Sequence, residues 1–253
     1  MPFDPFGDFH IAGYLRNIEA EKDLALVKAQ EKVFFEAHLE KALTFLHRIR
    51  GPVTYVHFRK VHEMLFAEFY PWAGQDREHL GVATQVNRGG VVDFERADRI
   101  AQAIQWGFEM GNSTTQMQQK PGAIMGAFAW AHPFLDGNGR TMMLVHTELC
   151  RRAKILVDWP ATNKEAYLDA LARELKNPGG RYLDAYLGQF VRKAGGSDDL
   201  ATQLRELSGL DGLTVASADD VTYDASNEKA MASYRETKRS RGEEAHLADD
   251  PAI

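Results

Sequence analysis

Residues 121–154 of this 253-residue chain read PGAIMGAFAWAHPFLDGNGRTMMLVHTELCRRAK. Two apolar segments, Gly122–Ala131 and Thr141–Lys154, are typical of helices, and the polar residues between them form a loop. Pro121 suits the first turn of a helix, whereas Pro133 disfavours helical backbone at the residue before it. We therefore predict a helix, a short loop and a second helix, with the loop at the start of the second helix.

The loop begins with a base and contains one carboxylate. His132 projects from the end of the first predicted helix, and an imidazole is a usable base near neutral pH. Asp136 is the single carboxylate of the loop, and Mg²⁺ at phosphate sites is commonly held by one carboxylate together with phosphate oxygens and waters. The alternatives are a core histidine bonded to a carbonyl, and an aspartate that caps the helix or forms an Asx turn.

The second half of the loop favours an anion. Gly137, Asn138 and Gly139 offer consecutive backbone N–H groups, and the glycines have no Cβ to obstruct them. Arg140 lies in the first turn of the next helix, where the helix dipole disfavours a cation unless an anion binds beside it. An ordinary glycine-rich turn is the alternative for these residues taken singly. Together they predict chemistry on a phosphorylated small molecule, with a nucleotide preferred.

The composition of the chain fits a protein that folds in water around a sizeable core. Hydrophobic residues make up 44% and charged residues 26% of the sequence. The single cysteine, Cys150, excludes an internal disulfide, and its apolar surroundings predict a buried, inert thiol. The first residues lack the regions of a signal peptide, and no apolar run has the length of a membrane span. We expect a cytoplasmic protein, with secretion into a host cell as the alternative.

The net charge of −6 is concentrated in the last part of the chain. Residues 195–253 hold six Lys and Arg against thirteen Asp and Glu, a balance of −7, so residues 1–194 carry +1. Neither part has the basic excess of a nucleic-acid surface, so no nucleic-acid partner is expected. A polar, acidic tail of this kind is typical of a solubilising or disordered extension.

Hydrophobic periodicity predicts an all-α domain over residues 1–194 and a polar, weakly structured extension over 195–253. Residues 80–92 have strand character and are expected to form a small hairpin that turns at Gly89 and Gly90, whereas 157–160 is expected to be a loop. The expected helices are 19–49 (one or two), 55–69, 93–108 or 98–108, 121–131, 141–154, 163–175 and 182–191, with 200–207 and 228–239 as short helices in the extension.

Three other groups of residues are expected to be structural. His57 and His62 are five residues apart on a predicted helix, which is not a spacing of metal ligands, so solvated or packed positions are expected. His146 and Glu148 are expected to support the core behind the loop. The basic cluster of residues 238–241 is expected on a solvated helix face, with a secretion or partner-docking signal as the alternative.

The loop from His132 to Arg140 resembles the signature of the Fic family, His-x-Phe-x-Asp/Glu-Gly-Asn-Gly-Arg-x-x-Arg. The resemblance extends over about residues 55–191 and includes Tyr70–Gly74 and the glycine-containing hairpin. It implies an all-α domain with a small β-hairpin flap over the active site. Most characterised members transfer AMP from ATP to a hydroxyl side chain of a target protein, so the resemblance implies that activity, with ATP and Mg²⁺ as the molecules bound.

The resemblance also implies a role for each residue of the loop. His132 would be the general base for the target hydroxyl, and Asp136 would hold Mg²⁺ between the α- and β-phosphates. The Gly137–Gly139 segment would form the anion hole for the α-phosphate, and Arg140 would bind the β- and γ-phosphates. The flap would clamp a segment of the target protein as an added strand. The residues of the flap are Asn87, Arg88, Gly89, Gly90, Val91 and Val92.

One position departs from the family pattern, because Met143 stands where the second arginine is expected. Loss of one charge-assisted contact weakens triphosphate binding by roughly ten- to a hundredfold. Poor use of ATP, a different donor, or compensation by Arg151 or Arg152 would each be consistent with this change. Packing of Met143 in the core is the structural alternative.

The same arginine pairs, in the family, with the glutamate of an inhibitory motif, Ser/Thr-x-x-x-Glu-Gly/Asn. No glutamate of this chain is followed by Gly or Asn. The two absences are consistent, because an inhibitory glutamate would have no arginine to pair with. We therefore expect an enzyme that this glutamate switch does not restrain.

Three hypotheses for function follow. The preferred one is Mg²⁺-dependent transfer of AMP from ATP to a Ser, Thr or Tyr hydroxyl of a target protein, with release of pyrophosphate. The second keeps the enzyme but changes the transferred group to UMP, another nucleotide or phosphocholine. The third is a scaffold or adaptor that retains the pocket. The expected partner is the target protein, and a small antitoxin or regulatory chain is left open as a second partner.

Overall fold

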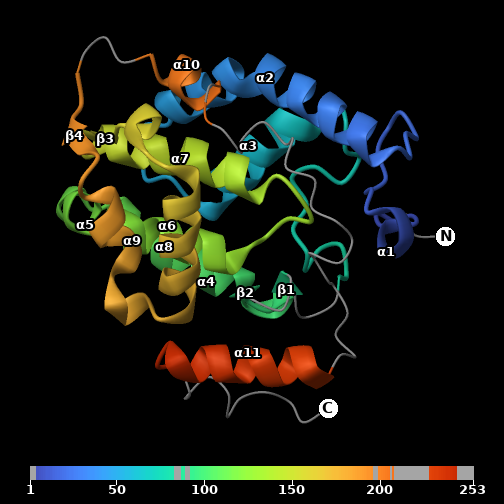
Figure 1. Ribbon diagram of the computed structural model, residues 1–253. Helices are drawn as coiled ribbons and strands as arrows, with labels where there is room; N and C mark the ends of the chain where they lie inside the picture. Colours follow the sequence, from blue (N-terminus) through green and yellow to red (C-terminus); the bar gives the residue numbers. More distant parts are fainter. Residues whose placement is uncertain are drawn as a thin grey trace.

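Helices make up most of the structure, and the strands form short antiparallel pairs (Figure 1). The computed structural model describes residues 4–82, 87–88, 92–195, 199–205, 207 and 228–243. The helices are α1 (Phe9–Ala12), α2 (Leu24–Arg48), α3 (Tyr55–Phe66), α4 (Ile100–Gly111), α5 (Thr114–Gln119), α6 (Pro121–Ala131), α7 (Asn138–Arg152), α8 (Lys164–Lys176), α9 (Tyr182–Leu187), α10 (Leu200–Arg205) and α11 (Glu228–Ser240). The strands are β1 (Asn87–Arg88), β2 (Val92–Asp93), β3 (Ile155–Val157) and β4 (Val191–Lys193), and the short 3-10 helices are η1 (Ala97–Arg99), η2 (Trp159–Ala161) and η3 (Pro178–Gly180).

Helix α6 lies at the centre of the fold and ends directly before the residue that opens the motif. It packs against α4, α7, α8 and α9, and nine of its eleven residues are buried. A helix that is apolar all round requires neighbours on every side. The helix therefore ends at a fixed place inside the protein, at Ala131, and the motif loop begins there.

Helix α2 runs across the top of the molecule in Figure 1 and packs against α3 and α7. The side chain of Asp23 caps the helix by accepting hydrogen bonds from the N–H groups of Ala25 and Leu26. The helix is continuous, so the region 19–49 forms one long helix rather than two. Its inward stripe, at spacings of three and four residues, comprises Val27, Glu31, Phe35, Leu39, Ala42 and Leu46.

A second pair of strands was not predicted. Strand β3 pairs with β4 in antiparallel register, with Ile155 opposite Lys193 and Val157 opposite Val191. The expected loop 157–160 therefore begins in a strand, and the expected helix 182–191 ends at Leu187. Three-residue strands are too short to produce a periodic signal, so the apolar residues after α9 continued a helical pattern in the sequence.

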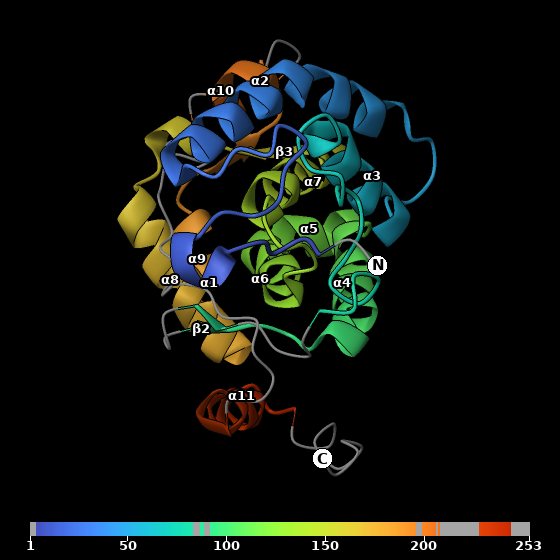
Figure 2. The same cartoon turned by 90° about the vertical axis from the view of Figure 1, so that its right-hand side faces the viewer.

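The extension beyond residue 195 contains two helices that pack on the rest of the protein. Helix α10 contacts α2 and α7, whereas α11 contacts β2 and α8. Figures 1 and 2 both show α11 on the side of the molecule opposite α2 and α10. These two helices correspond to the short helices expected at 200–207 and 228–239. None of the described helices has both the length and the apolar composition needed to span a membrane.

Candidate active site

The backbone turns sharply at His132, where α6 ends. His132 has φ 40° and ψ 59°, a left-handed conformation that is uncommon for a residue with a side chain. Arg77 holds this turn, because its Nε donates to the carbonyl of His132 at 2.8 Å and its backbone N–H donates to the carbonyl of Pro133 at 2.7 Å. The ring of Phe94 stacks on the imidazole with 3.9 Å between centroids. The side chain of His132 is therefore placed by contacts on both its backbone and its ring.

Asn138 closes the loop and contacts the imidazole of His132. The Asn138 Oδ1 accepts from the N–H of Phe134 at 2.9 Å, and its Nδ2 donates to the carbonyl of Phe134 at 2.7 Å. This pair of bonds sets the orientation of the amide, so that Nδ2 also faces His132 Nε2 at 3.2 Å as a donor. The arrangement requires a lone pair on Nε2, which is the state of a base.

The N-terminus of α7 presents backbone N–H groups beside His132. Gly137 precedes the helix with φ 77°, and the first bond of the helix runs from the N–H of Thr141 to the carbonyl of Gly137 at 3.0 Å. The N–H groups of Asn138, Gly139 and Arg140 therefore have no acceptor within the helix. Gly139 is exposed, and a Cβ built there would meet nothing within 4 Å. The structure thus has space for an anion at this helix end.

The rings of Phe134 and His62 stack on each other beneath the motif loop and hold it in place. Phe134 is fully buried, as its apolar character predicts, and stacks on His62 with 3.7 Å between centroids. His62 Nε2 donates to the carbonyl of Asp136 at 2.9 Å, and His62 Nδ1 accepts from the N–H of Gly74 at 2.8 Å. Burial lowers the pKa of His62 to about 3, so the ring is neutral and can make both bonds. His62 is packed, as expected, but it also fixes the position of Asp136.

Asp136 lies between two cations. Its Oδ2 is 2.5 Å from Lys28 Nζ, and its Oδ1 is 3.3 Å from Arg140 NH2 and accepts from the N–H of Gly137 at 2.6 Å. Burial favours the neutral acid, but the charges of Lys28 and Arg140 outweigh it and hold the pKa of Asp136 far below its usual range. The carboxylate is ionised and bonds its neighbouring N–H, whereas the cap position of α7 is Gly137.

Arg140 is buried and paired with a glutamate from α2. Its NH2 donates to Glu31 Oε1 at 2.6 Å, and its guanidinium carbon lies 4.6 Å from the centre of the Phe66 ring. The side chain of Arg140 is 6% exposed and that of Glu31 is fully buried. Arg140 NH1 is buried and forms no hydrogen bond to any residue that the structure describes. A phosphate oxygen would satisfy this donor.

The donor set fits a magnesium ion that arrives with a nucleotide. Within the described part of the chain, no group of three or more His, Cys, Asp or Glu side chains is placed to hold a metal. A single carboxylate, Asp136, is the contribution that a protein commonly makes to Mg²⁺ bound through phosphate oxygens and waters. The ion would replace Lys28 as the partner of Oδ2.

The predicted hairpin is present in its described residues. Strands β1 and β2 pair antiparallel, with Asn87 opposite Asp93 and Arg88 opposite Val92. Gly89, Gly90 and Val91 lie outside the described residues. Phe94 follows β2 directly and stacks on His132, so the end of the hairpin lies against the motif histidine.

Glu95, the next residue, joins the hairpin to α11. Its Oε2 accepts from Lys238 Nζ at 2.9 Å and from Trp130 Nε1 at 3.0 Å, while its Oε1 accepts from the hydroxyl of Tyr234 at 2.7 Å. Burial raises the pKa of Glu95, but the charge of Lys238 outweighs it, so the pKa is lowered. The side chain of Lys238 is 2% exposed, and the guanidinium carbon of Arg241 lies 4.0 Å from the centre of the Trp130 ring. The prediction of a solvated face for this basic cluster is therefore wrong for these two side chains.

The residues proposed to compensate for Met143 do not reach the loop. Met143 is 3% exposed in the core, as the structural alternative predicted. Arg151 and Arg152 lie at the far end of α7, and both donate to Glu148 at 2.7–2.8 Å. Arg152 also donates to carbonyls at the C-terminal end of α2. Compensation by either arginine is excluded, because the helix places them roughly 17 Å along its axis from Arg140.

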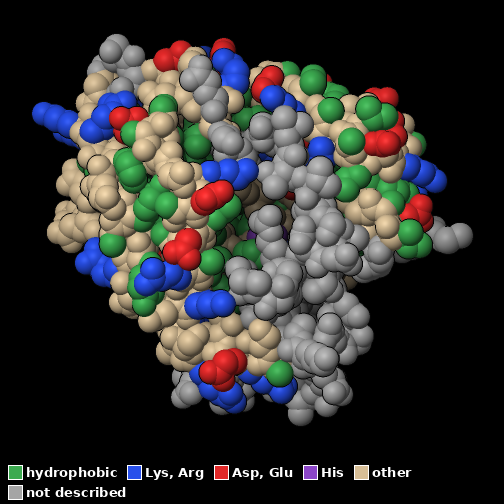
Figure 3. Space-filling model, in the orientation of Figure 1, with side chains coloured by type: hydrophobic (Ala, Val, Ile, Leu, Met, Phe, Trp, Pro, Cys, Tyr) green, Lys and Arg blue, Asp and Glu red, His purple; other side chains and the backbone are tan. Residues whose placement is uncertain are grey.

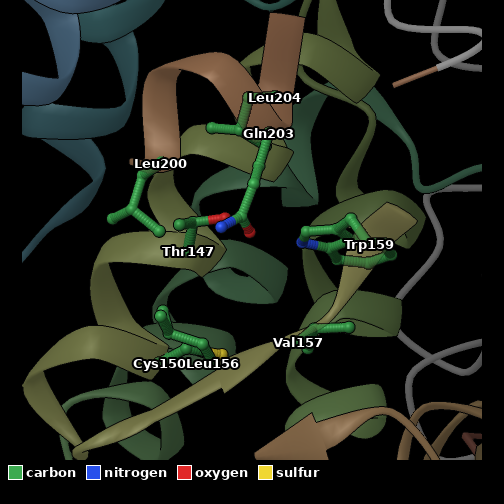
Figure 4. Close-up of a pocket in the computed structure, with 8 residues that line it drawn as sticks. All are labelled: Thr147, Cys150, Leu156, Val157, Trp159, Leu200, Gln203 and Leu204. Atoms are coloured by element: carbon green, nitrogen blue, oxygen red, sulfur yellow. The ribbon is translucent and has the colours of Figure 1, made fainter. Parts of the chain in front are cut away.

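A hollow at the other end of α7 contains no motif residue. Figure 4 shows it between α7, β3 and α10, with Gln203 directed toward Thr147. It encloses no volume that a water molecule could fill, and it includes Cys150, whose buried thiol has a raised pKa as an inert cysteine should. On the face shown in Figure 3, basic and acidic side chains are interspersed rather than gathered by sign.

Four residues that surround the motif were missed in the sequence: Lys28, Glu31, Arg77 and Glu95. Glu31 had a usable signal, because it is the charged residue within the inward stripe of α2, where its neighbours one turn away are Val27 and Phe35. The other three have no comparable signal in the sequence, and only their long-range contacts reveal them.

Comparison with known proteins gives the same assignment. The sequence profile of the Fic/DOC family matches residues 52–150. The chain is 28% identical over 164 residues to protein adenylyltransferase VbhT of Bartonella schoenbuchensis, and this match covers 64% of the chain but only 34% of VbhT. It is 27% identical over 150 residues to the protein named Probable protein adenylyltransferase y4lH of Sinorhizobium fredii, with 56% of the chain and 73% of that protein covered.

A solved structure supports the same fold. BepC of Bartonella tribocorum, a VirB-translocated effector protein solved with bound AMPPNP, superposes with a TM-score of 0.58 at 17% identity over 73% of this chain and 95% of BepC. At this identity the likeness concerns the fold. Together, the helical core, the loop from His132 to Arg140 and the profile match show that the chain carries a domain of the Fic/DOC family.

Proposed function

We propose that the protein transfers AMP from ATP to a Ser, Thr or Tyr hydroxyl of a target protein. The observation that carries the proposal is the meeting, within one loop, of a histidine with a lone pair on Nε2 and a helix end with unsatisfied N–H groups. The names of VbhT and y4lH as adenylyltransferases support the same activity.

The loop supplies the parts that this reaction needs. His132 Nε2 would take the proton of the target hydroxyl as its oxygen attacks the α-phosphorus of ATP. The bond to the bridging oxygen of the β-phosphate would then break, and pyrophosphate would leave. Transfer of this kind depends on positioning and on charge neutralisation more than on covalent catalysis.

The remaining residues would bind the charged part of the substrate. The N–H groups of Asn138 and Gly139 would donate to phosphate oxygens, and Arg140, whose buried NH1 has no hydrogen-bond partner among the described residues, would bind another. Asp136 would hold Mg²⁺, which neutralises phosphate charge when bound. Described residues Asn87–Arg88 and Val92–Asp93 form a strand pair next to His132 that would accept a target segment as an added strand.

Incubation of cell lysate with Mg²⁺ and ATP labelled at the α-phosphate tests the proposal. We expect label on a discrete protein band with the wild-type protein and none with His132→Ala. ATP labelled at the γ-phosphate is the control and should give no band that depends on His132. Label from the γ-position only would overturn AMP transfer.

A second candidate, transfer from another donor, is favoured by Met143. Methionine carries no charge and its side chain lies in the core, so position 143 supplies no cation to a triphosphate. The same lysate experiment with labelled UTP, GTP, CTP and CDP-choline distinguishes the donors. Nucleotide binding without transfer from any of them would favour the scaffold hypothesis.

A further inference from the structure

Lys28 is a cation at the motif that neither the sequence pattern nor the family match assigns. It lies on α2, 108 positions from Asp136, and its Nζ is 2.5 Å from Asp136 Oδ2 and 2.9 Å from Glu31 Oε2. Its side chain is 12% exposed. Lys28 therefore occupies the carboxylate oxygen that a metal ion would use.

The two cations at Asp136 differ in how firmly they are held. Arg140 lies against the Phe66 ring, and its planar head is bonded to the fully buried Glu31. Lys28 pairs with the same two carboxylates as Arg140, Glu31 and Asp136, but through a compact ammonium on a flexible four-carbon stem. Lys28 can change partners by rotating its stem, whereas Arg140 cannot move without disrupting the core.

The charges at the site balance only because Lys28 is present. Lys28 and Arg140 are opposed by Glu31 and Asp136, so the four side chains together are neutral. Without Lys28 the cluster would carry a net negative charge and would repel a magnesium triphosphate, which is itself an anion. Met143 adds no charge here.

We infer, on the basis of the proposed function, that Lys28 holds Asp136 in the absence of nucleotide and moves to the phosphate oxygens when a magnesium nucleotide binds. Lys28 then supplies, from α2, the positive charge that position 143 does not supply from α7. The metal ion thus replaces Lys28 at Asp136, so metal binding and the release of Lys28 occur together.

This exchange predicts opposite effects when Lys28 is removed. Metal alone should bind more tightly, because Asp136 loses the cation that competes for its Oδ2. Nucleotide should bind about ten- to a hundredfold more weakly, because one charge-assisted contact is lost. A lysine that only stabilised the fold would weaken both.

The experiment uses the full chain with Lys28→Met and the matched control Lys32→Met, four residues along α2. The side chain of Lys32 is 34% exposed and pairs with Glu36 at 3.7 Å on the surface. Mn²⁺ alone is titrated by the electron paramagnetic resonance signal of the free ion, and a fluorescent ATP analogue with Mg²⁺ is titrated separately. We expect tighter Mn²⁺ and weaker nucleotide for Lys28→Met, and wild-type values for Lys32→Met.

Each arm can overturn its part of the inference. Equal nucleotide affinity in Lys28→Met and wild type would overturn the phosphate contact, and weaker Mn²⁺ binding would overturn the competition at Asp136. Lys28→Gln keeps a hydrogen-bond donor for the carboxylates and should show the same directions if Lys28→Met fails to fold. If the wild type binds no nucleotide, the proposed function itself fails, whereas the Mn²⁺ titration still decides whether Lys28 competes at Asp136.

Discussion

Glu31 Oε1 and Arg140 NH2 lie 2.6 Å apart in the interior of the protein, although 109 positions separate the two residues in the sequence. The pair joins the start of α7 to the N-terminal third of α2. Because Arg140 belongs to the motif loop, the geometry of this loop depends on a residue outside the part that the family profile matches.

Glu31→Gln should destabilise the protein strongly. Glu31 pairs with both Lys28 and Arg140, so the neutral glutamine leaves these two cations with Asp136 as their remaining carboxylate. Loss of one partner from a buried ion pair costs roughly 3–5 kcal/mol. Urea unfolding followed by circular dichroism measures the change. Glu36→Gln on the exposed side of the same helix is the control and should change the free energy of unfolding by less than about 0.5 kcal/mol. Equal small effects of the two changes would show that the pair contributes little.

Gly137→Ala and Gly139→Ala should separate folding from nucleotide binding. A Cβ at Gly137 would lie 2.6 Å from the Phe66 ring and would adopt φ 77°, so this variant should lose about 2–4 kcal/mol of stability. A Cβ at Gly139 has open space in the structure, so this variant should unfold like the wild type. Titration with a fluorescent ATP analogue should nevertheless show weaker binding to Gly139→Ala. Unchanged affinity would mean that no ligand approaches the backbone at that position.

Lys238→Met should weaken the packing of α11 on the rest of the protein. The buried carboxylate of Glu95 would lose its ion-pair partner. We expect a loss of roughly 3 kcal/mol, because the ion pair of Lys238 with Glu95 is buried on both sides. Hydrogen exchange of the α11 amides, read by mass spectrometry, should accelerate. Arg239→Met is the control on the same helix, where the arginine is 53% exposed, and should leave the exchange unchanged. Slow exchange in both variants would contradict a role for the ion pair in holding the helix.

The stability of the protein should fall as the pH drops below about 6.5. Burial lowers the pKa of His146 to about 4, while its Nε2 donates to the carbonyl of Pro121 at 2.8 Å. Between these two values the unfolded chain takes up a proton that the folded protein does not, so acid favours unfolding. The loss from this residue between pH 7 and pH 5 is about 2 kcal/mol.

Urea unfolding at several pH values measures this dependence, to which His62 contributes in the same direction. His146→Gln keeps a donor for Pro121 but cannot be protonated. Its stability should therefore depend less steeply on pH between 7 and 5. An identical slope in the variant and the wild type would assign the acid sensitivity to other groups.

The sequence predicts those parts of the structure that depend on local or periodic patterns. The apolar run from Gly122 to Ala131 marks the central helix, and the loop after it is recognised from nine consecutive residues. Proline and glycine residues mark the ends of the helices on either side of the loop. The alternation of apolar and polar residues near residue 88 indicates the hairpin. Each of these features is contained within a few turns of the chain.

Long-range electrostatic pairs could not be predicted in this way. Lys28 in α2 lies between Val27 and Ala29, and Lys238 in α11 lies between Thr237 and Arg239. One bonds Asp136 and the other bonds Glu95. The packing of the helices determines which carboxylate a lysine pairs with, and local sequence patterns contain no information about this pairing. The strand at Val191–Lys193 was missed for a related reason, because its partner supplies the hydrogen bonds that define it.

The position of α11 also orders events during synthesis. The ribosome completes the loop from His132 to Arg140 about ninety residues before it adds Tyr234 and Lys238, which bond Glu95 behind the histidine. A nascent chain in the exit tunnel, or one cut short by a premature stop or a protease before α11, keeps every motif residue but has no cation for that carboxylate. Translation thus delays the completion of this side of the site until the rest of the domain has emerged.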